Sequence, residues 1–361
     1  MRALPPAPPF AYPPSVHFPI SPGALRGLGA ALLFGVSTPV AKLLLPGTGP
    51  FTVAALLYLG SGLGFIALGG LFKGDREAPL RRADLPLLAA VTASGGVVAP
   101  VLLMLGLSRL DGASASLLLN LEAPLTIALA VGIFGESLTG REVAGAAAVV
   151  AGGALLASGG GGARPELFGA LAVAGAGLGW ALDNNLSARL SLRDPIAVVR
   201  VKSMVAGGVN LALAFAVGER LPSGGAVLAT LVTGFFGYGV SIVLHMLAMR
   251  VLGAARQGTL FASAPFAGAV ASLPILGERL SGHQLLAGAV MAAGVGVMLR
   301  SRHGHLHTHE PLEHDHVHVH DEHHPHAHDG PATGPHSHRH LHEPLVHDHV
   351  HTPDAHHRHA H

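Results

Sequence analysis

The chain has 361 residues, of which half are apolar and only 12 % are charged, and its mean hydropathy is +0.49. A typical soluble chain has about a quarter of its residues charged, so this composition excludes an ordinary soluble protein. The formal net charge of +1 gives no reason to expect nucleic acid as a partner, and the absence of cysteine excludes disulfides and thiolate metal sites.

The first 23 residues contain eight prolines and no continuous apolar core. A secretory signal needs such a core, so the segment predicts a disordered Pro-rich leader over residues 1–23.

Apolar stretches of about twenty residues then follow one another, each long enough to cross about 30 Å of hydrocarbon as a helix. No alternating strand pattern occurs between them, and in lipid the backbone must satisfy its own hydrogen bonds. We therefore expect an all-α integral membrane protein with ten transmembrane helices. The spans are expected at about 25–45, 51–72, 84–107, 113–134, 138–158, 166–187, 195–217, 225–250, 256–276 and 281–300.

The basic residues predict an orientation. With the N-terminus in the cytoplasm, fourteen Lys and Arg fall in internal segments and four in external joints, leaving aside Lys42 and Lys202 within spans. Cytoplasmic loops carry the excess of Lys and Arg, so both termini are expected in the cytoplasm.

The body of the chain is written twice. "APLTIALAVGIFGESLTGREVAG" (123–145) matches "APFAGAVASLPILGERLSGHQLLAG" (264–288), and "LLFGVSTPVAKLL" (32–44) can be laid on "GLGWALDNNLSARL" (177–190). Five spans in each copy is an odd number, so the second copy is expected to lie inverted, with a site between the copies near the bilayer midplane.

This pattern resembles the EamA repeats of the drug/metabolite transporter superfamily. The resemblance rests on "GESL" at 135–138, "GERL" at 277–280, the Ala-Pro span before each, and Lys42 in the first span. Many relatives carry an arginine near the position of Tyr58, and this chain does not.

The resemblance covers residues 25–300 and implies two inverted repeats, at 24–158 and 164–301. It also implies a carrier, usually an exporter, in the bacterial inner (cell) membrane, driven by an electrochemical gradient and not by ATP. We accordingly expect no enzyme activity and no nucleotide cofactor, in agreement with the lack of a "GxxxxGK[ST]" stretch.

Two acidic residues lie inside predicted spans, where a charge costs about 2.5–3.5 kcal/mol on insertion scales. Glu122 precedes Pro124, which frees a carbonyl and is expected to kink the span. The repeat places Ser263 opposite Glu122 and Ser37 opposite Asp183, so shared architecture does not require either acid. This asymmetry favours a functional interpretation over a structural hydrogen bond.

Asp183 begins the most polar triplet of any span, Asp-Asn-Asn, and at most two of its members can face one cavity, because helical neighbours lie about 100° apart. The acids are candidates for carrying a proton or, with amide oxygens, a hard cation; the alternative is a helix end at the interface. A lone histidine in a span is either a ligand or a packing residue, and Lys202 is expected to snorkel to the interface. The predicted transport cavity comprises Asn120, Glu122, Asp183, Asn184, Asn185 and His245.

The tail, residues 302–361, is His-rich: 23 of the 26 histidines lie beyond residue 302. Residues 309–328 match residues 342–361 at 15 of 20 positions, which no affinity tag would show. Little is available to bury, so a packed domain is not expected. Imidazole with adjacent carboxylate suits Zn²⁺, Ni²⁺, Co²⁺ or Cu²⁺. The candidate metal ligands are His314, Asp315, His316, His318, His320, His323, His324, His347, Asp348, His349, His351, His356 and His357.

Three functions are consistent with these features. In the first, a proton-coupled exporter carries metal that the tail collects. In the second, the exporter carries an organic metabolite or drug, and the tail stores metal or regulates transport. In the third, the protein is a membrane metal receptor that transports nothing. The tail has its own alternative, a pH-responsive cationic segment. The expected partners are the lipid bilayer and a small-molecule or metal-ion substrate, and a homodimer is left open.

Overall fold

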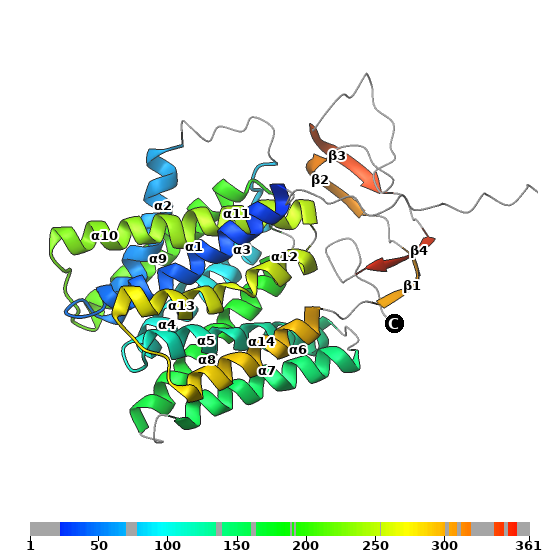
Figure 1. Ribbon diagram of the computed structural model, residues 1–361. Coiled ribbons are helices and arrows are strands. Elements are labelled where there is room, and N and C mark those ends of the chain that lie inside the picture. Colours follow the sequence, from blue (N-terminus) through cyan, green and yellow to red (C-terminus); the bar gives the residue numbers. More distant parts are fainter. Residues whose placement is uncertain are drawn as a thin grey trace, which may run out of the picture.

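A computed structural model of the protein describes residues 22–69, 78–134, 139–159, 164–187, 190, 193–252, 254–299, 303–308, 312–318, 336–342 and 346–351. Figure 1 shows a bundle of helices followed by short strands. The predicted leader up to residue 21 lies outside the described residues.

The helices of the first half are α1 (Pro22–Leu44), α2 (Pro50–Ala67), α3 (Leu85–Val91), α4 (Ala99–Leu107), α5 (Gly112–Leu118), α6 (Glu122–Phe134) and α7 (Gly140–Gly159). Those of the second half are α8 (Arg164–Ser187), α9 (Pro195–Ala216), α10 (Gly224–Gly234), α11 (Ser241–Leu252), α12 (Ala254–Phe261), α13 (Ala264–Leu276) and α14 (Gly282–Leu299).

Eight helical segments among the described residues are long and apolar enough to cross a membrane. They confirm a multi-pass membrane protein. The segments predicted as ninth and tenth spans contain the shorter apolar helices α13 and α14, so the count of ten stays a prediction.

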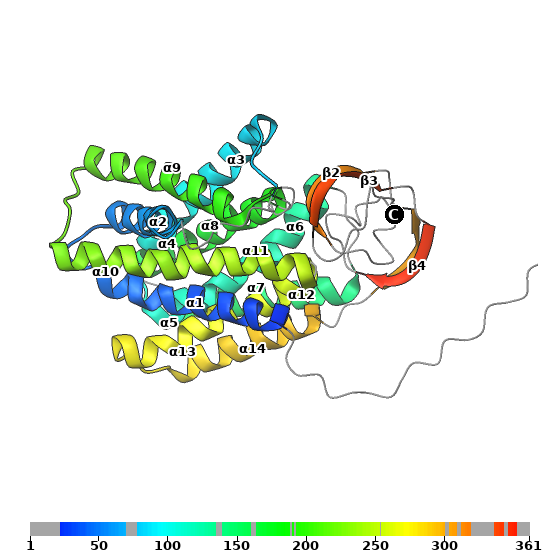
Figure 2. The ribbon, with the colours of Figure 1, turned by 90° about the horizontal axis from the view of Figure 1, so that it is seen from above.

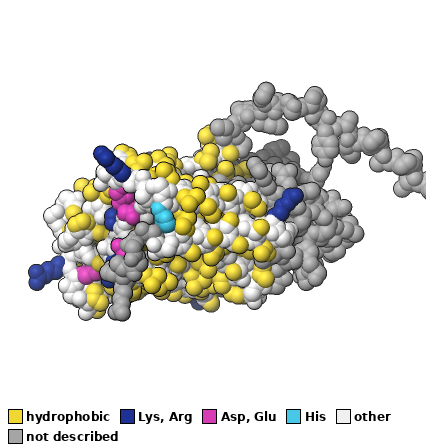
Figure 3. All heavy atoms as spheres, turned by 60° about the horizontal axis from the view of Figure 1, so that its bottom comes forward, with side chains coloured by type: hydrophobic (Ala, Val, Ile, Leu, Met, Phe, Trp, Pro, Cys, Tyr) yellow, Lys and Arg dark blue, Asp and Glu magenta, His cyan; other side chains and the backbone are white. Residues whose placement is uncertain are grey.

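Apolar side chains cover the outside of the bundle. Leu32, Leu171, Leu228 and Val270 are each more than half exposed. On the face drawn in Figure 3, hydrophobic side chains fill the middle and charged ones lie toward the ends. An apolar band of this kind is stable against lipid and would be costly in water.

The two halves of the chain pack against each other, and both of the buried apolar clusters contain residues from each half. Helix α2 lies against α9 and α10, α1 against α11 and α13, and α7 against α14, so each of these contacts joins the first repeat to the second. Figures 1 and 2 show the two halves interleaved and not side by side.

Small residues allow this close packing. Gly60 and Gly64 of one Gly-x-x-x-Gly stretch face Leu231 and Phe235, and Gly175 and Gly179 of the other face α4. A Cβ atom on Gly60 would overlap the backbone of Leu231. The helix packing that such spacing favours in membranes is therefore present.

Gly234→Ala is expected to destabilise the protein by about 1–3 kcal/mol, the usual cost of overpacking, because its Cβ atom would overlap the backbone of Leu57. Gly208→Ala is the matched control, since no atom lies within 4 Å of the added carbon, and it is expected to be neutral or stabilising. Thermal unfolding in detergent measures both. Equal transition temperatures would contradict the contact between α2 and α10.

Among the described residues, four of the predicted spans depart from a regular α-helix, and in the ninth a two-residue turn at 262–263 separates α12 from α13. The third span contains a π-helical segment, Thr92–Val98, and the eighth contains another, Phe235–Val240. The fourth span is broken by a 3-10 turn, Leu119–Leu121, and α6 begins at Glu122. The turn ends just before Pro124, and the kink expected at this proline stays a prediction.

The tail adds strands to the all-α architecture that the sequence predicts. These are β1 (His303–Thr308), β2 (Leu312–His318), β3 (His336–His342) and β4 (Val346–His351). They form two separate antiparallel pairs, β1 with β4 and β2 with β3.

Candidate functional site

The first helices of the two repeats, α1 and α8, contact each other through aromatic side chains at the centre of the bundle. The alignment that places Ser37 opposite Asp183 also places Phe34 opposite Trp180. These two rings touch, with centroids 5.5 Å apart and planes at 80°. Tyr238 lies 5.6 Å from Phe34, and Tyr58 lies 5.4 Å from Tyr238. Four helices therefore meet in one buried aromatic cluster.

The first π-helical segment presents its carbonyl groups to this cluster. A π turn changes the intrahelical hydrogen bonding, and such turns are frequent at functional sites. The Gly95 carbonyl accepts hydrogen bonds from the Tyr58 hydroxyl at 2.5 Å and from the Trp180 indole nitrogen at 3.0 Å. The Gly96 carbonyl accepts one from the Asn210 amide at 3.1 Å. These bonds fix the third span against α2, α8 and α9.

The two π-helical segments make matching contacts across the repeat boundary. A Cβ atom on Gly95 would overlap the Asp183 side chain, and one on Gly237 would overlap Ser37. Because Ser37 and Asp183 are aligned in the repeat, these two contacts are equivalent. Hence the repeat seen in the sequence is also a repeat of tertiary contacts.

Asp183 forms an ion pair with Lys202 of α9. Both residues are buried, with exposed fractions of 8 % and 7 %. The Ser187 hydroxyl also donates a hydrogen bond to Asp183, at 2.9 Å. The expectation that Lys202 snorkels to the interface is therefore wrong. Its ammonium group turns inward because Asp183 offers a buried counter-charge.

Glu122 has a different environment. It is half-buried at the start of α6, and its carboxylate accepts a hydrogen bond from the side-chain amide of Asn184 at 2.6 Å. Asn185 donates to the Thr126 carbonyl of the same helix at 3.1 Å. Two members of the polar triplet therefore face α6 and the third faces α9, as the helical spacing predicts.

The other predicted cavity residues lie apart from this group. Asn120 is buried, and its side chain donates to the Leu117 carbonyl one turn earlier. The His245 ring is 3.0 Å from the Gln257 amide nitrogen, and its centroid is 4.6 Å from that of Phe261. Their participation in transport stays a prediction.

The candidate metal ligands of the tail are only partly described. His320, His323, His324, His356 and His357 lie outside the described residues. The backbone register pairs His314, His316 and His318 of β2 with His340, His338 and His336 of β3. It likewise pairs His347, His349 and His351 of β4 with His307, His305 and His303 of β1. Asp315 and Asp348 lie opposite Arg339 and Leu306.

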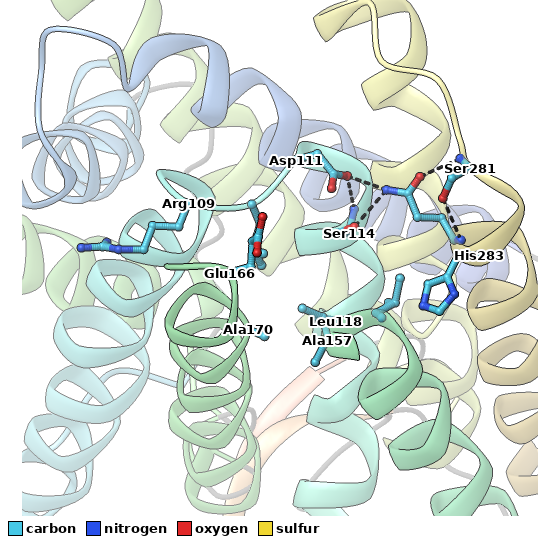
Figure 4. Close-up of a pocket in the computed structure, with 12 residues that line it drawn as sticks. Arg109, Asp111, Ser114, Leu118, Ala157, Glu166, Ala170, Ser281 and His283 are labelled. Carbon is cyan, nitrogen blue, oxygen red and sulfur yellow. Dashed lines mark hydrogen bonds between the residues drawn. The ribbon is translucent and has the colours of Figure 1, made fainter. Parts of the chain in front are cut away.

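The structure contains a cavity of about 320 Å³ between α5, α7, α8 and α14 (Figure 4), which the sequence did not predict. Ser114 and Asp111 line it, and the Gln284 amide donates to both of them at 2.9 Å. Glu166 and His283 lie on opposite sides of it, and Arg109 extends away from the other lining residues. No motif indicates this cavity, because its lining comes from four separate helices and from the joints before two of them.

A membrane bundle of two repeats, with buried charges between them, is the architecture of a transport protein. The EamA-like transporter family matches residues 21–158 and 167–300, and this chain belongs to that family, within the drug/metabolite transporter superfamily.

Relatives agree with this assignment. The chain is 32 % identical over 299 residues to an uncharacterized transporter of Methanothermobacter thermautotrophicus, a match that covers 76 % of this chain and 85 % of that protein. It also resembles a protein of known crystal structure, with 22 % identity and a TM-score of 0.57, over 78 % of this chain and 99 % of the other. The second likeness supports the fold alone.

Proposed function

We propose that this membrane transporter is a proton-coupled exporter of a small organic solute, and that Glu122 carries the proton. The observation that supports this most is the contrast between the two carboxylates of the spans. Glu122 bonds to the neutral amide of Asn184, whereas Asp183 bonds to the ammonium group of Lys202. Protonating Asp183 would leave a buried, unpaired cation, which is strongly unfavourable. Protonating Glu122 leaves no such charge.

The ion pair between Asp183 and Lys202 also helps to choose between a metal and an organic cargo. A divalent cation bound to Asp183 would lie against the Lys202 ammonium group, and like charges at that distance repel strongly in a medium of low dielectric constant. The aromatic cluster of Phe34, Tyr58, Trp180 and Tyr238 next to this pair suits an organic solute. Both observations favour an organic cargo over a metal ion.

Metal export is the second candidate, and the tail supports it. Its described strands place histidine opposite histidine at six register positions, three in each pair. In either case, we propose that the tail binds Zn²⁺, Ni²⁺, Co²⁺ or Cu²⁺. In the metal hypothesis it collects cargo; in the organic one it stores metal or regulates transport. A receptor that transports nothing is the third candidate.

The proposed topology has ten spans in two inverted repeats, in the bacterial inner membrane, with both termini cytoplasmic. The distribution of basic residues supports the orientation. Formation of a homodimer stays a prediction.

Glu122→Gln is expected to abolish solute uptake into inside-out vesicles whose lumen is acidified, because the amide side chain cannot exchange a proton. The vesicles are incubated with a mixture of small metabolites and with Ni²⁺, Co²⁺ and Zn²⁺, and their contents are measured by mass spectrometry. Ser263→Ala, at the matching position of the second repeat, is the control and is expected to transport normally.

The outcomes separate the candidates. Organic uptake that survives removal of the tail would support the proposal. Metal uptake that weakens without the tail would replace it with metal export. Unaltered uptake by Glu122→Gln would exclude Glu122 as the proton carrier, and no uptake by any form would indicate a receptor.

A further inference from the structure

Two glutamates of the second repeat hold helix N-termini of the first repeat. The Glu219 carboxylate accepts hydrogen bonds from the backbone N–H groups of Phe51 and Thr52, at 3.3 and 2.7 Å, and from the Thr52 hydroxyl at 2.9 Å. The Glu278 carboxylate accepts them from the N–H groups of Gly112 and Ala113, at 2.7 and 2.9 Å.

These contacts are electrostatically strong. The first N–H groups of a helix have no intrahelical partner and carry the positive end of the helix dipole, so a carboxylate suits them. Gly49, just before α2, has a φ of 98°, and a Cβ atom there would overlap the Glu219 carboxylate. The chain is thus shaped locally to admit this side chain.

Both contacts lie at the same end of the bundle. They involve the joints after the first, third, seventh and ninth spans, and these joints share one side of the membrane because each follows an odd-numbered span. In Figure 1 the N-terminal end of α10 and the C-terminal end of α13 lie at the left, away from the strands of the tail. The proposed orientation makes this the outer face.

A different pair joins the repeats at the opposite end. The Arg193 guanidinium group bonds to both Asp84 carboxylate oxygens, at 2.9 and 3.3 Å, and the Asp194 N–H group bonds to the Ala78 carbonyl. Glu219 and Asp84 occupy related places, because each precedes the first α-helix of its repeat's third span, α10 or α3, and contacts the start of the other repeat's second span. The repeat thus supplies one contact of this kind at each membrane face, and Glu278 adds a second inter-repeat contact at the outer face.

The cavity described above lies beside the Glu278 contact. Asp111 and Ser114 line the cavity, and the two amides bound by Glu278 lie between them in the sequence. The first turn of α5 is therefore held by Glu278 and adjoins about 320 Å³ of free space. The Gln284 amide also bonds Asp111 and Ser114, so release of the Glu278 carboxylate leaves this turn held by a neutral side chain beside a space into which it can move.

From this geometry we propose that Glu219 and Glu278 are the gating residues of the outer face, closed in this structure, and that both must release α2 and α5 for cargo to leave. This inference rests on the proposed transport function. It assigns roles to two residues outside the buried site, and it predicts that the outer path opens between α5 and α13.

Accessibility of a single cysteine tests the gate, since the natural chain has none. Ser116 is fully buried in α5 and faces Gly268 of α13, so Ser116→Cys exchanges one atom at the place where the path would open. The measurement is its rate of modification by a membrane-impermeant maleimide applied from the outer face. We expect slow labelling in the otherwise natural chain and several-fold faster labelling with Glu278→Gln or Glu219→Gln.

Glu142→Gln is the matched control. Glu142 also accepts hydrogen bonds from a backbone N–H group and a hydroxyl, both of Thr139, but this contact stays within the first turn of α7. It should leave the labelling rate unchanged. Equal rates in all variants, or equal acceleration by Glu142→Gln, would overturn the proposal.

Hydrogen exchange on the unaltered chain covers the case in which the variants do not fold. If the gate opens, the amides of Thr52, Gly112 and Ala113, which the gating carboxylates hold, should exchange faster than the Thr139 amide, which Glu142 holds within its own helix start, and equal protection would overturn the proposal. Neither measurement needs a cargo or a proton gradient. A gate that fails and a transport proposal that fails are therefore distinguishable.

Discussion

Lys202→Met is expected to destabilise the protein by about 3–5 kcal/mol, the cost of breaking a buried ion pair by removing one partner. Asp183 would be left buried, with the Ser187 hydroxyl as its remaining partner among the bonds described above. A single hydrogen bond from a neutral group does not replace the lost ammonium group. Thermal or denaturant unfolding of the protein in detergent measures the loss.

The double variant Lys202→Met with Asp183→Asn should recover most of the stability, since it removes both charges together. Lys42→Met serves as the matched control. The Lys42 ammonium group donates to the Leu107 and Leu110 carbonyls, so its removal leaves no buried carboxylate and should cost only about 1–3 kcal/mol. If Lys202→Met lowered the free energy of unfolding no more than Lys42→Met does, the idea that the buried ion pair stabilises the fold would be contradicted.

Ending the chain at Arg302 is expected to abolish binding of Zn²⁺ and Ni²⁺, because 23 of the 26 histidines lie beyond it. Isothermal titration at pH 7.5 compares the full chain with the shortened one. Metal displaces protons from imidazole, and free histidine has a pKa of about 6.5. Binding should therefore be strong above this pH and should weaken as the pH falls through it.

His245→Gln combined with His283→Asn is the control for the tail, because it removes both histidines of the helical body and should leave binding intact. Metal binding retained by the shortened chain would contradict the assignment to the tail. A full chain that binds no metal at pH 7.5 would favour the alternative of a pH-responsive cationic segment.

Much of the architecture follows from local sequence. Apolar stretches and lack of charge predict membrane helices, because lipid excludes unpaired backbone groups. The Gly-x-x-x-Gly stretches predict close helix contacts, which the structure shows for α2 against α10 and for α8 against α4. Each of these features depends on residues a few positions apart.

The internal repeat predicts relations between residues that lie far apart in the chain. Aligning Ser263 with Glu122 and Ser37 with Asp183 identifies the two acids that break the symmetry. The second alignment also places Phe34 opposite Trp180, and the structure shows these two rings in contact. An alignment shows which positions are equivalent. It does not show which side chains touch.

The decisive pairings depend on tertiary structure. The sequence predicts Lys202 as an interfacial residue, but the rotation of α9 places it against Asp183. Glu278 belongs to a helix-ending motif in the sequence, and in the structure it bonds to the N–H group of Gly112, 166 residues away in the chain. The carbonyls of the π-helical segment find donors on three other helices. Such contacts are set by the depth and rotation of separate helices, quantities that no local pattern encodes. Hence composition and periodicity determine the class of protein, whereas packing determines which charges are neutralised, and our proposals for the proton carrier and the gate rest on that packing.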